Sequence, residues 1–210
     1  MRGLLIAVCG LDGSGKTTQI KMLEEWFVKN NLSVLLTRQP TDYYRQDNRV
    51  RQYLDSGECP DMQAIALLAA ADRRWHMKTC VEPSINEGTN IITDRYLYSS
   101  LAYFKVRGLE PEYIKAINGD IRTPDVTVFL DLEPEITLKR VKNRDGKLTK
   151  YEERDPDMFR NIRAAFKQVL PNEALILDAT QKPTDIHQLI IKEVENKLKL
   201  IEEVELYETR

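Results

Sequence analysis

The residues best suited to chemistry stand near the start of the chain, in the run Gly10-Leu-Asp-Gly-Ser-Gly15-Lys16-Thr17. This spacing matches the phosphate-binding pattern G-x-x-x-x-G-K-[ST] at every position. Glycines let successive backbone N–H groups turn towards phosphate oxygens, and the helix that follows adds the positive end of its dipole. Lys16 is then expected to reach the β- and γ-phosphates, and the Thr17 hydroxyl to bind Mg²⁺. The segment therefore predicts binding of a nucleoside triphosphate.

A second group with chemical potential is Asp94-Arg95-Tyr96, which follows the apolar run 90–93. In an open parallel sheet, ligands collect at the carboxyl ends of the strands. A carboxylate there can hold Mg²⁺ directly or through water, and an arginine can donate two N–H groups to one phosphate. The alternative is a structural ion pair at a strand end. An N-K-x-D specificity motif is absent from the sequence, which argues against a GTPase.

Asp72 and Arg73 emerge from a small and apolar stretch, Ala69-Ala70-Ala71. Burying a charged pair there is costly unless a partner or a ligand compensates for the lost hydration. The alternative is a solvated end of the helix, because charges on a helix usually face water. His76 follows closely and is expected to be a surface or hydrogen-bonded residue rather than a catalyst.

The segment 139–154 carries seven basic residues against three acidic ones, a local charge of +4 on a chain whose formal net charge is −2. Gly146 and a broken apolar periodicity indicate a loop between two helices. A solvated charged face is one interpretation, and a nucleic-acid patch fits poorly without interleaved aromatic residues. Phosphoryl transfer spreads negative charge over the oxygens of the group in transit, and a closing basic lid would neutralise it. We therefore expect a basic lid around 140–155.

These groups need a scaffold, and the sequence predicts an α/β fold. The apolar run 4–9 precedes the phosphate-binding loop, and apolar β-rich runs then alternate with helical patterns. Strands are predicted at about 3–9, 33–37, 90–93, 126–132 and 174–177. Helices are predicted near 16–30, 46–56, 61–87, 97–107, 111–119, 134–143, 156–170 and 184–204. This order predicts a three-layer fold of the P-loop NTPase type, with a central five-stranded parallel sheet wrapped by helices and one domain over residues 1–210.

Composition excludes several classes of function. A net charge of −2 argues against a general surface for nucleic acid, and no apolar run has the length of a membrane span. Met1-Arg2 leads straight into the first predicted strand, so no signal peptide is expected. The three cysteines are an odd number without metal-ligand spacing, which suits a reducing compartment. We expect a cytoplasmic protein.

The motifs together resemble the thymidylate kinase family of nucleoside monophosphate kinases. The resemblance extends over nearly the whole chain, and D-R-Y-x-x-S-x-x-A-Y is more specific than the phosphate-binding loop. The segments that carry it are 10–19, 37–40, 70–73, 94–103, 124–131 and 177–180. It implies transfer of a phosphoryl group from ATP to dTMP with Mg²⁺, small-molecule partners only, and a homodimer.

The resemblance also implies roles for individual residues. Arg38 and Arg95 would hold the acceptor phosphate, Arg73 would contact the base, and Tyr103 would disfavour a ribose 2′-hydroxyl. The implied catalytic residues are Lys16, Asp94, Arg95 and Arg144, and the implied metal ligands are Thr17 and Asp94. The implied ATP-binding residues are Gly10, Asp12, Gly13, Ser14, Gly15, Lys16, Thr17, Thr18, Arg140 and Thr180. The implied acceptor-binding residues are Asp12, Arg38, Arg73, Arg95, Ser99 and Tyr103.

Gly13 and Ser14 occupy the interior of the phosphate-binding loop, where one kind of family member has arginine. Basic residues instead enrich the segment expected to form the lid, as in the second, mostly bacterial, kind. These residues are Arg140, Arg144, Lys147 and Lys150.

Two departures from the family pattern touch the acceptor. Ala69 stands where the family often has a phenylalanine that stacks on thymine, a contact worth about 1–3 kcal/mol. Tyr43, Tyr44 and Trp75 are candidates to replace that ring. The segment 39–44 also lacks the usual acidic residue and diglycine. The alternatives are a kinase for another deoxynucleoside monophosphate, such as dUMP or a modified pyrimidine, and a non-catalytic ATP-binding regulator.

Overall fold

The computed structural model describes residues 2–146 and 155–208, and five strands of these residues form one sheet in the order β2-β3-β1-β4-β5. Every neighbouring pair is parallel, and β1 lies between β3 and β4 with Val8 beside Asp94 and Val128. The strands are β1 (Leu5–Gly10), β2 (Val34–Arg38), β3 (Asn90–Asp94), β4 (Val126–Asp131) and β5 (Leu175–Asp178). All residues of β1 are buried because helices cover both faces, which is why its sequence is a continuous apolar run.

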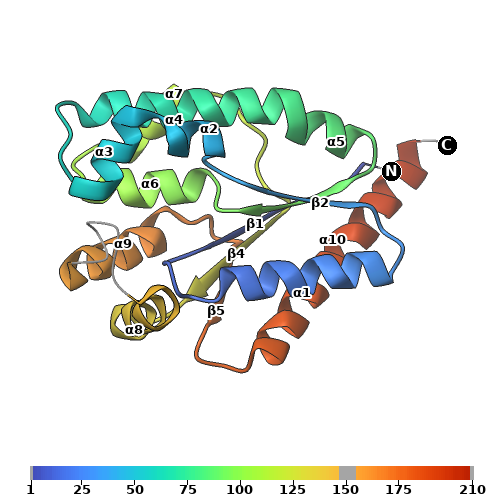
Figure 1. Ribbon diagram of the computed structural model, residues 1–210. Helices are drawn as coiled ribbons and strands as arrows, with labels where there is room; N and C mark the ends of the chain where they lie inside the picture. The colour runs from blue at the N-terminus through green and yellow to red at the C-terminus, as the bar shows by residue number, and fades with distance from the viewer. Residues whose placement is uncertain (1, 147–154, 209–210) are drawn as a thin grey trace.

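Helices form a layer on each side of the sheet (Figure 1). α1 (Lys16–Lys29) and α10 (Pro183–Glu208) cover one face, and their apolar side chains share a core with the central strands. α4 (Met62–His76), α5 (Glu82–Asn86), α6 (Leu97–Val106) and α7 (Pro111–Asn118) lie on the other side. α9 (Pro156–Val169) packs against α6, and α8 (Pro134–Asp145) packs against α9. The predicted α/β architecture is confirmed.

The boundaries of the predicted strands are confirmed to within about two residues, but two helical regions differ. The structure has α2 (Asp42–Gln46), a short helix that the sequence did not predict, before α3 (Asn48–Ser56). The Thr41 hydroxyl accepts a hydrogen bond from the Tyr43 N–H and so caps α2. A helix of five residues is too short to show an apolar periodicity in the sequence, so its place depends on tertiary contacts.

The long helix predicted near 61–87 contains a π-helical turn, η1 (Met77–Val81), between α4 and α5. Pro83 follows this turn and lies within α5. Proline lacks an N–H, and its ring collides with the carbonyl one turn earlier, so the backbone widens where a regular helix is not possible. The chain nevertheless continues in one direction through all three elements (Figure 1).

Because all the strands are parallel, their carboxyl ends share one edge of the sheet. Gly10, Arg38, Asp94, Asp131 and Asp178 are the last residues of the five strands, so the predicted catalytic groups start from this edge. None of the described helices combines the length and the low polarity that a bilayer span requires.

Candidate active site

The phosphate-binding loop joins β1 to α1 and turns through glycines in the left-handed region. Gly13 has φ +88°, and a Cβ there would come within 2.5 Å of the Thr137 carbonyl oxygen. Lys16 is buried, and its Nζ donates hydrogen bonds to the carbonyls of Gly10 (3.3 Å) and Leu11 (3.0 Å). Its ammonium group also lies 3.5 Å from an Asp12 carboxylate oxygen. The Lys16 ammonium group therefore lies against the backbone of the phosphate-binding loop, where its predicted phosphate ligands would bind.

Asp94 and Thr17 face one cavity beside this loop, together with Arg38. Asp94 Oδ1 is buried and has no hydrogen-bond partner among the described residues. An unsatisfied buried carboxylate oxygen is costly, and a divalent cation is the ligand that would satisfy it. The described residues contain no group of three His, Cys, Asp or Glu side chains able to hold a metal. Thr17 and Asp94 both carry oxygen atoms, the ligands that hard divalent cations prefer.

Arg95 is held in a strained backbone conformation at the centre of the site. Its φ is +70°, a left-handed conformation that a non-glycine residue adopts only when the surroundings enforce it. The guanidinium donates to Asp12 at 2.6 Å and lies 5.1 Å from the centre of the Tyr103 ring. Burial opposes its charge, but Tyr103, Asp12 and Asp94 outweigh burial and raise the pKa of Arg95 further above its usual range. Arg95 is therefore a fixed cation next to the phosphate-binding loop.

A pocket opens on the other side of Arg95 and is lined from α2, α3, α4 and α6. Its polar and charged lining includes Asp12, Arg95 and Ser99, three of the residues predicted to bind the acceptor. The rest of the lining is Pro40, Tyr44, Arg45, Tyr53, Leu54, Ala69, Ser100, Tyr103, Phe104 and Arg107. Charged and aromatic side chains in one pocket suit a nucleoside monophosphate, which combines a charged phosphate with a flat base.

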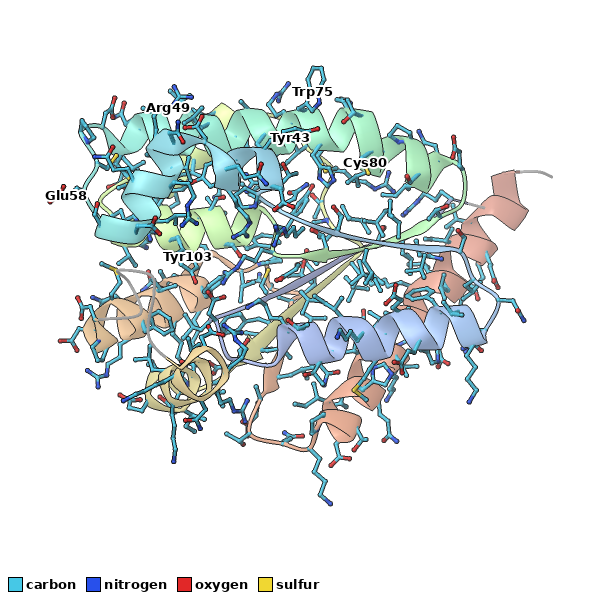
Figure 2. The ribbon with its side chains drawn as sticks, in the orientation of Figure 1. Tyr43, Arg49, Glu58, Trp75, Cys80 and Tyr103 are labelled. Carbon is cyan, nitrogen blue, oxygen red and sulfur yellow. The ribbon has the colours of Figure 1, made fainter. Side chains whose placement is uncertain are left out.

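Of the three rings proposed to replace the phenylalanine missing at Ala69, Tyr44 is the one that lines the pocket. Tyr53 and Phe104, which the sequence did not single out, line it as well. Tyr43 and Trp75 are outside its lining and are 85% and 70% exposed. Figure 2 shows Trp75 projecting outward from α4, whereas Tyr103 lies between α6 and α9.

Arg73 lies behind the pocket wall rather than in the cavity. The residue is fully buried, and its guanidinium donates to Gln39 Oε1 (3.0 Å), Ser100 Oγ (2.6 Å) and Asn118 Oδ1. Burial lowers its pKa to about 10, with Tyr96 and Asp72 opposing the shift. The expected contact between Arg73 and the base would therefore have to pass through Ser100, which does line the pocket.

The remaining predicted residues lie around the same strand edge. Arg38 is half-exposed and pairs with Asp42. Thr18 is exposed on the first turn of α1, and Ser14 Oγ is buried with no hydrogen-bond partner among the described residues. The Thr180 hydroxyl donates to Asp178 at 2.7 Å in the turn after β5.

The described part of the expected lid is the end of α8. Arg140 on this helix donates to the Gly13 carbonyl at 3.5 Å, which ties the helix to the phosphate-binding loop. Arg144 is exposed and donates two hydrogen bonds to Asp145. Lys147 and Lys150 lie outside the described residues.

Two arginines that the sequence did not single out also line the pocket. Burial and the nearby Arg95 and Arg38 lower the pKa of Arg45, and its Nε donates to the Pro40 carbonyl at 3.1 Å. Arg107 stacks over Tyr53 and Tyr103, with centroid distances of 5.1 and 5.3 Å. Arg45 sits on the unpredicted helix α2, so no sequence signal could find it. Arg107 follows Tyr103 by one helical turn, a spacing that could have drawn attention to it.

The sheet order, the phosphate-binding loop after its central strand and the adjoining acceptor pocket define a P-loop nucleotide kinase. The family comparison is consistent with this class. A family model described as thymidylate kinase matches residues 8–190, and the chain belongs to that family. A "Probable thymidylate kinase" of Pyrococcus horikoshii is 38% identical over 94% of this chain and 98% of its own length. A "Thymidylate kinase" of Clostridium novyi is 34% identical over 94% of this chain and 99% of its own length.

Proposed function

We propose that this chain transfers the γ-phosphoryl group of ATP to dTMP, giving dTDP and ADP. One contact carries the proposal. Asp12 of the phosphate-binding loop accepts a hydrogen bond from Arg95 of the acceptor pocket at 2.6 Å, so the two nucleotide sites meet at a single ion pair. Donor and acceptor phosphates bound on either side would then face each other, which is the positioning that phosphoryl transfer requires.

The residues supply position and charge rather than a covalent intermediate. An oxygen of the acceptor phosphate attacks the γ-phosphorus in line, and the bond from that phosphorus to the ADP oxygen breaks. Lys16 would exchange the carbonyls of Gly10 and Leu11 for phosphate oxygens and follow the migrating charge. Arg95, held in place by Asp12, clamps the acceptor phosphate.

Thr17 and Asp94 are the residues that would hold Mg²⁺, because both face the cavity beside the phosphate-binding loop. The ion, when bound, neutralises phosphate charge. Arg140, already at the Gly13 carbonyl, would close over ATP with the lid around 140–155, and Arg144 would contact the transferred group.

Ser100 gives the pocket a preference among bases. Arginine can only donate hydrogen bonds, so the Ser100 oxygen accepts from Arg73 and its own proton remains available to the pocket. That proton suits a carbonyl oxygen on the base, which thymine and uracil offer, better than the amino group of cytosine. Tyr44, Tyr53 and Phe104 would pack against the base.

We also propose that the protein is a cytoplasmic homodimer. On α4, the apolar side chains of Leu67 and Trp75 are 49% and 70% exposed. A second copy of this chain would cover that surface. Light scattering at micromolar concentration should return about two chain masses, and a value near one chain mass would contradict the dimer.

The test of the reaction is ADP release in a coupled assay with ATP and Mg²⁺, against dTMP, dUMP, dCMP, dGMP, dAMP and UMP. Strong preference for dTMP supports the proposal. Turnover of a different monophosphate would keep the kinase and overturn the substrate, with dUMP favouring the alternative raised by Ala69. No acceptor-dependent release, with ATP still bound, would instead favour the regulatory alternative.

A further inference from the structure

His76 and the acceptor pocket are linked by an unbroken chain of side-chain hydrogen bonds. His76 Nδ1 lies 3.1 Å from Gln39 Nε2, and His76 Nε2 lies 2.9 Å from Thr37 Oγ1. Gln39 is fully buried, and its Oε1 accepts from Arg73 Nε at 3.0 Å. Arg73 in turn donates to Ser100 Oγ at 2.6 Å. The chain starts in the cavity beside the phosphate-binding loop, which His76 lines, and ends in the pocket, which Ser100 lines.

The direction of each hydrogen bond follows from Arg73. A guanidinium has no acceptor, so the Gln39 atom facing Arg73 must be the carbonyl oxygen. The amide nitrogen of Gln39 therefore faces His76 and donates to Nδ1. His76 then carries its proton on Nε2, where it donates to Thr37. This neutral tautomer is the form that satisfies every one of these groups.

We propose that His76 is a positioning residue for the acceptor pocket: it fixes the Gln39 amide, which fixes Arg73 and through it the Ser100 hydroxyl. A protonated His76 would place an N–H against the Gln39 NH₂ group. Turning the amide over would relieve that contact only by placing NH₂ against the Arg73 N–H. Either arrangement leaves a buried donor unpaired and loosens the support of Ser100.

The electrostatic surroundings agree with this assignment. Burial lowers the pKa of His76, and Asp72 on the same helix opposes the shift. The charged and titratable groups that share its cavity are Arg38, Asp42, Tyr43 and Asp94. The positioning role rests on the proposed function, since it is the acceptor nucleotide that Ser100 would contact.

The sharpest test is the variant Gln39→Glu, with the pKa of His76 as the measured quantity. The chain has two histidines, so NMR can follow the titration of each one separately. In Gln39→Glu, one carboxylate oxygen would still accept from Arg73, while the other would require a donor from His76. We expect the His76 pKa to lie below its ordinary value of about 6.5 in the natural protein and to rise above it in Gln39→Glu. His187, on α10, should titrate alike in both proteins. An unchanged His76 pKa in the variant would overturn the arrangement.

Kinetics test the consequence for the acceptor. His76→Phe removes the acceptor of the Gln39 amide, and we expect KM for dTMP to rise about three- to tenfold, the effect of losing one buried hydrogen bond. KM for ATP should stay within about twofold, because the chain of hydrogen bonds ends in the acceptor pocket. His76→Asn, which keeps an acceptor oxygen near the position of Nδ1, should restore most of the dTMP affinity. An unchanged KM for dTMP in His76→Phe would overturn the positioning role.

The pH dependence separates this role from titration of the substrate phosphate, which occurs near pH 6. The ratio of KM for dTMP in the natural protein to that in His76→Asn cancels the substrate's own titration. This ratio should rise as the pH falls through the His76 pKa, and a flat ratio would count against the proposal. His187→Gln is the control and should behave as the natural protein does.

If His76→Phe does not fold, the His76→Asn kinetics and the Gln39→Glu titration still test the positioning role. If the natural protein does not phosphorylate dTMP, the proposed function fails, while the NMR titration still tests the hydrogen bonds.

Discussion

At the scale of single residues, the site depends on charges that are buried before any ligand arrives. Lys16 is buried, the Arg95 side chain is 11% exposed, and both lie against Asp12, while Asp94 Oδ1 is buried without a partner among the described residues. Burial in a low-dielectric setting strengthens the attraction of these groups for phosphate and metal.

Lys16→Ala should lower kcat by at least about 10²-fold, because a donor aimed at transition-state charge is lost. Steady-state ADP release measures the effect. Circular dichroism and a thermal melt verify that the fold is intact. A loss under threefold in a folded protein would contradict the role of Lys16.

Arg95→Ala should mainly weaken acceptor binding and turnover, since the guanidinium lies in the acceptor pocket and pairs with Asp12. A charge-assisted hydrogen bond to phosphate is worth about 1.5–3 kcal/mol, so the apparent Kd for dTMP should rise roughly 10- to 100-fold. Calorimetric titration with dTMP measures this. Lys105→Ala, which removes an exposed cation on α6, the helix that follows Arg95, is the control, and a dTMP titration unchanged by Arg95→Ala would refute the assignment.

Ala69→Phe tests whether the missing ring can simply be restored. Ala69 is 1% exposed and lines the pocket beside Tyr53 and Phe104, so a ring there would have to occupy pocket space or displace these neighbours. We expect a loss of about 1–3 kcal/mol in the free energy of unfolding and weaker dTMP binding. Urea unfolding and dTMP titration measure the two effects. Leu67→Phe, on the exposed side of the same helix, is the control, and tighter dTMP binding by Ala69→Phe would show that the pocket does accommodate the ring.

At the scale of elements, α9 is anchored to the strand edge by one carboxylate. Asp131, the last residue of β4, accepts from Arg163 at 2.6 and 3.1 Å and pairs with Lys167 at 2.8 Å, both on α9. The anchored helix α9 is in turn the surface against which α8, the helix that carries Arg140 and Arg144, packs.

Asp131→Asn should lower the free energy of unfolding by about 1–3 kcal/mol at neutral pH, because a hydrogen-bonded charge pair that is largely buried is lost. Although burial opposes it, hydrogen bonding to Arg163 and Lys167 lowers the pKa of Asp131. The stabilisation is therefore present above the unfolded-state pKa near 4 and disappears as the pH falls through the lower folded-state pKa. Urea unfolding at several pH values should show the two proteins converging in acid, and a constant difference would contradict this account.

At the scale of the whole molecule, the parallel sheet places the carboxyl ends of five strands at one edge. The phosphate-binding loop, Asp94 and Arg38 come from three different strands yet face one cavity. Trp75 of α4 points away from the sheet on the outer surface of the helical layer (Figure 2), where a second copy could bind without blocking that edge.

Trp75→Glu should therefore convert the proposed homodimer into a monomer, because a charge cannot be buried at an apolar interface without a partner. Light scattering across a range of concentrations measures the mass. The control is Val28→Glu, which places the same charge at a 62% exposed position on α1. Trp26, the other tryptophan, packs on the core and cannot serve as a surface control. A dimer that survives Trp75→Glu would place the interface elsewhere.

The sequence by itself determined the architecture and the place of the phosphate-binding loop between β1 and α1. Those features are local: a loop pattern, buried strands that read as apolar runs, and helices with clear boundaries. What only the tertiary structure decided is the acceptor side. Arg73 could be recognised as unusual from its apolar neighbours, but its burial behind Ser100, bonded to Gln39 and Asn118, depends on contacts between residues 27 to 45 positions apart. Tyr44, Arg45 and Tyr53 enter the pocket on two short helices whose place is set by packing, and no period in the sequence encodes which of their side chains points inward.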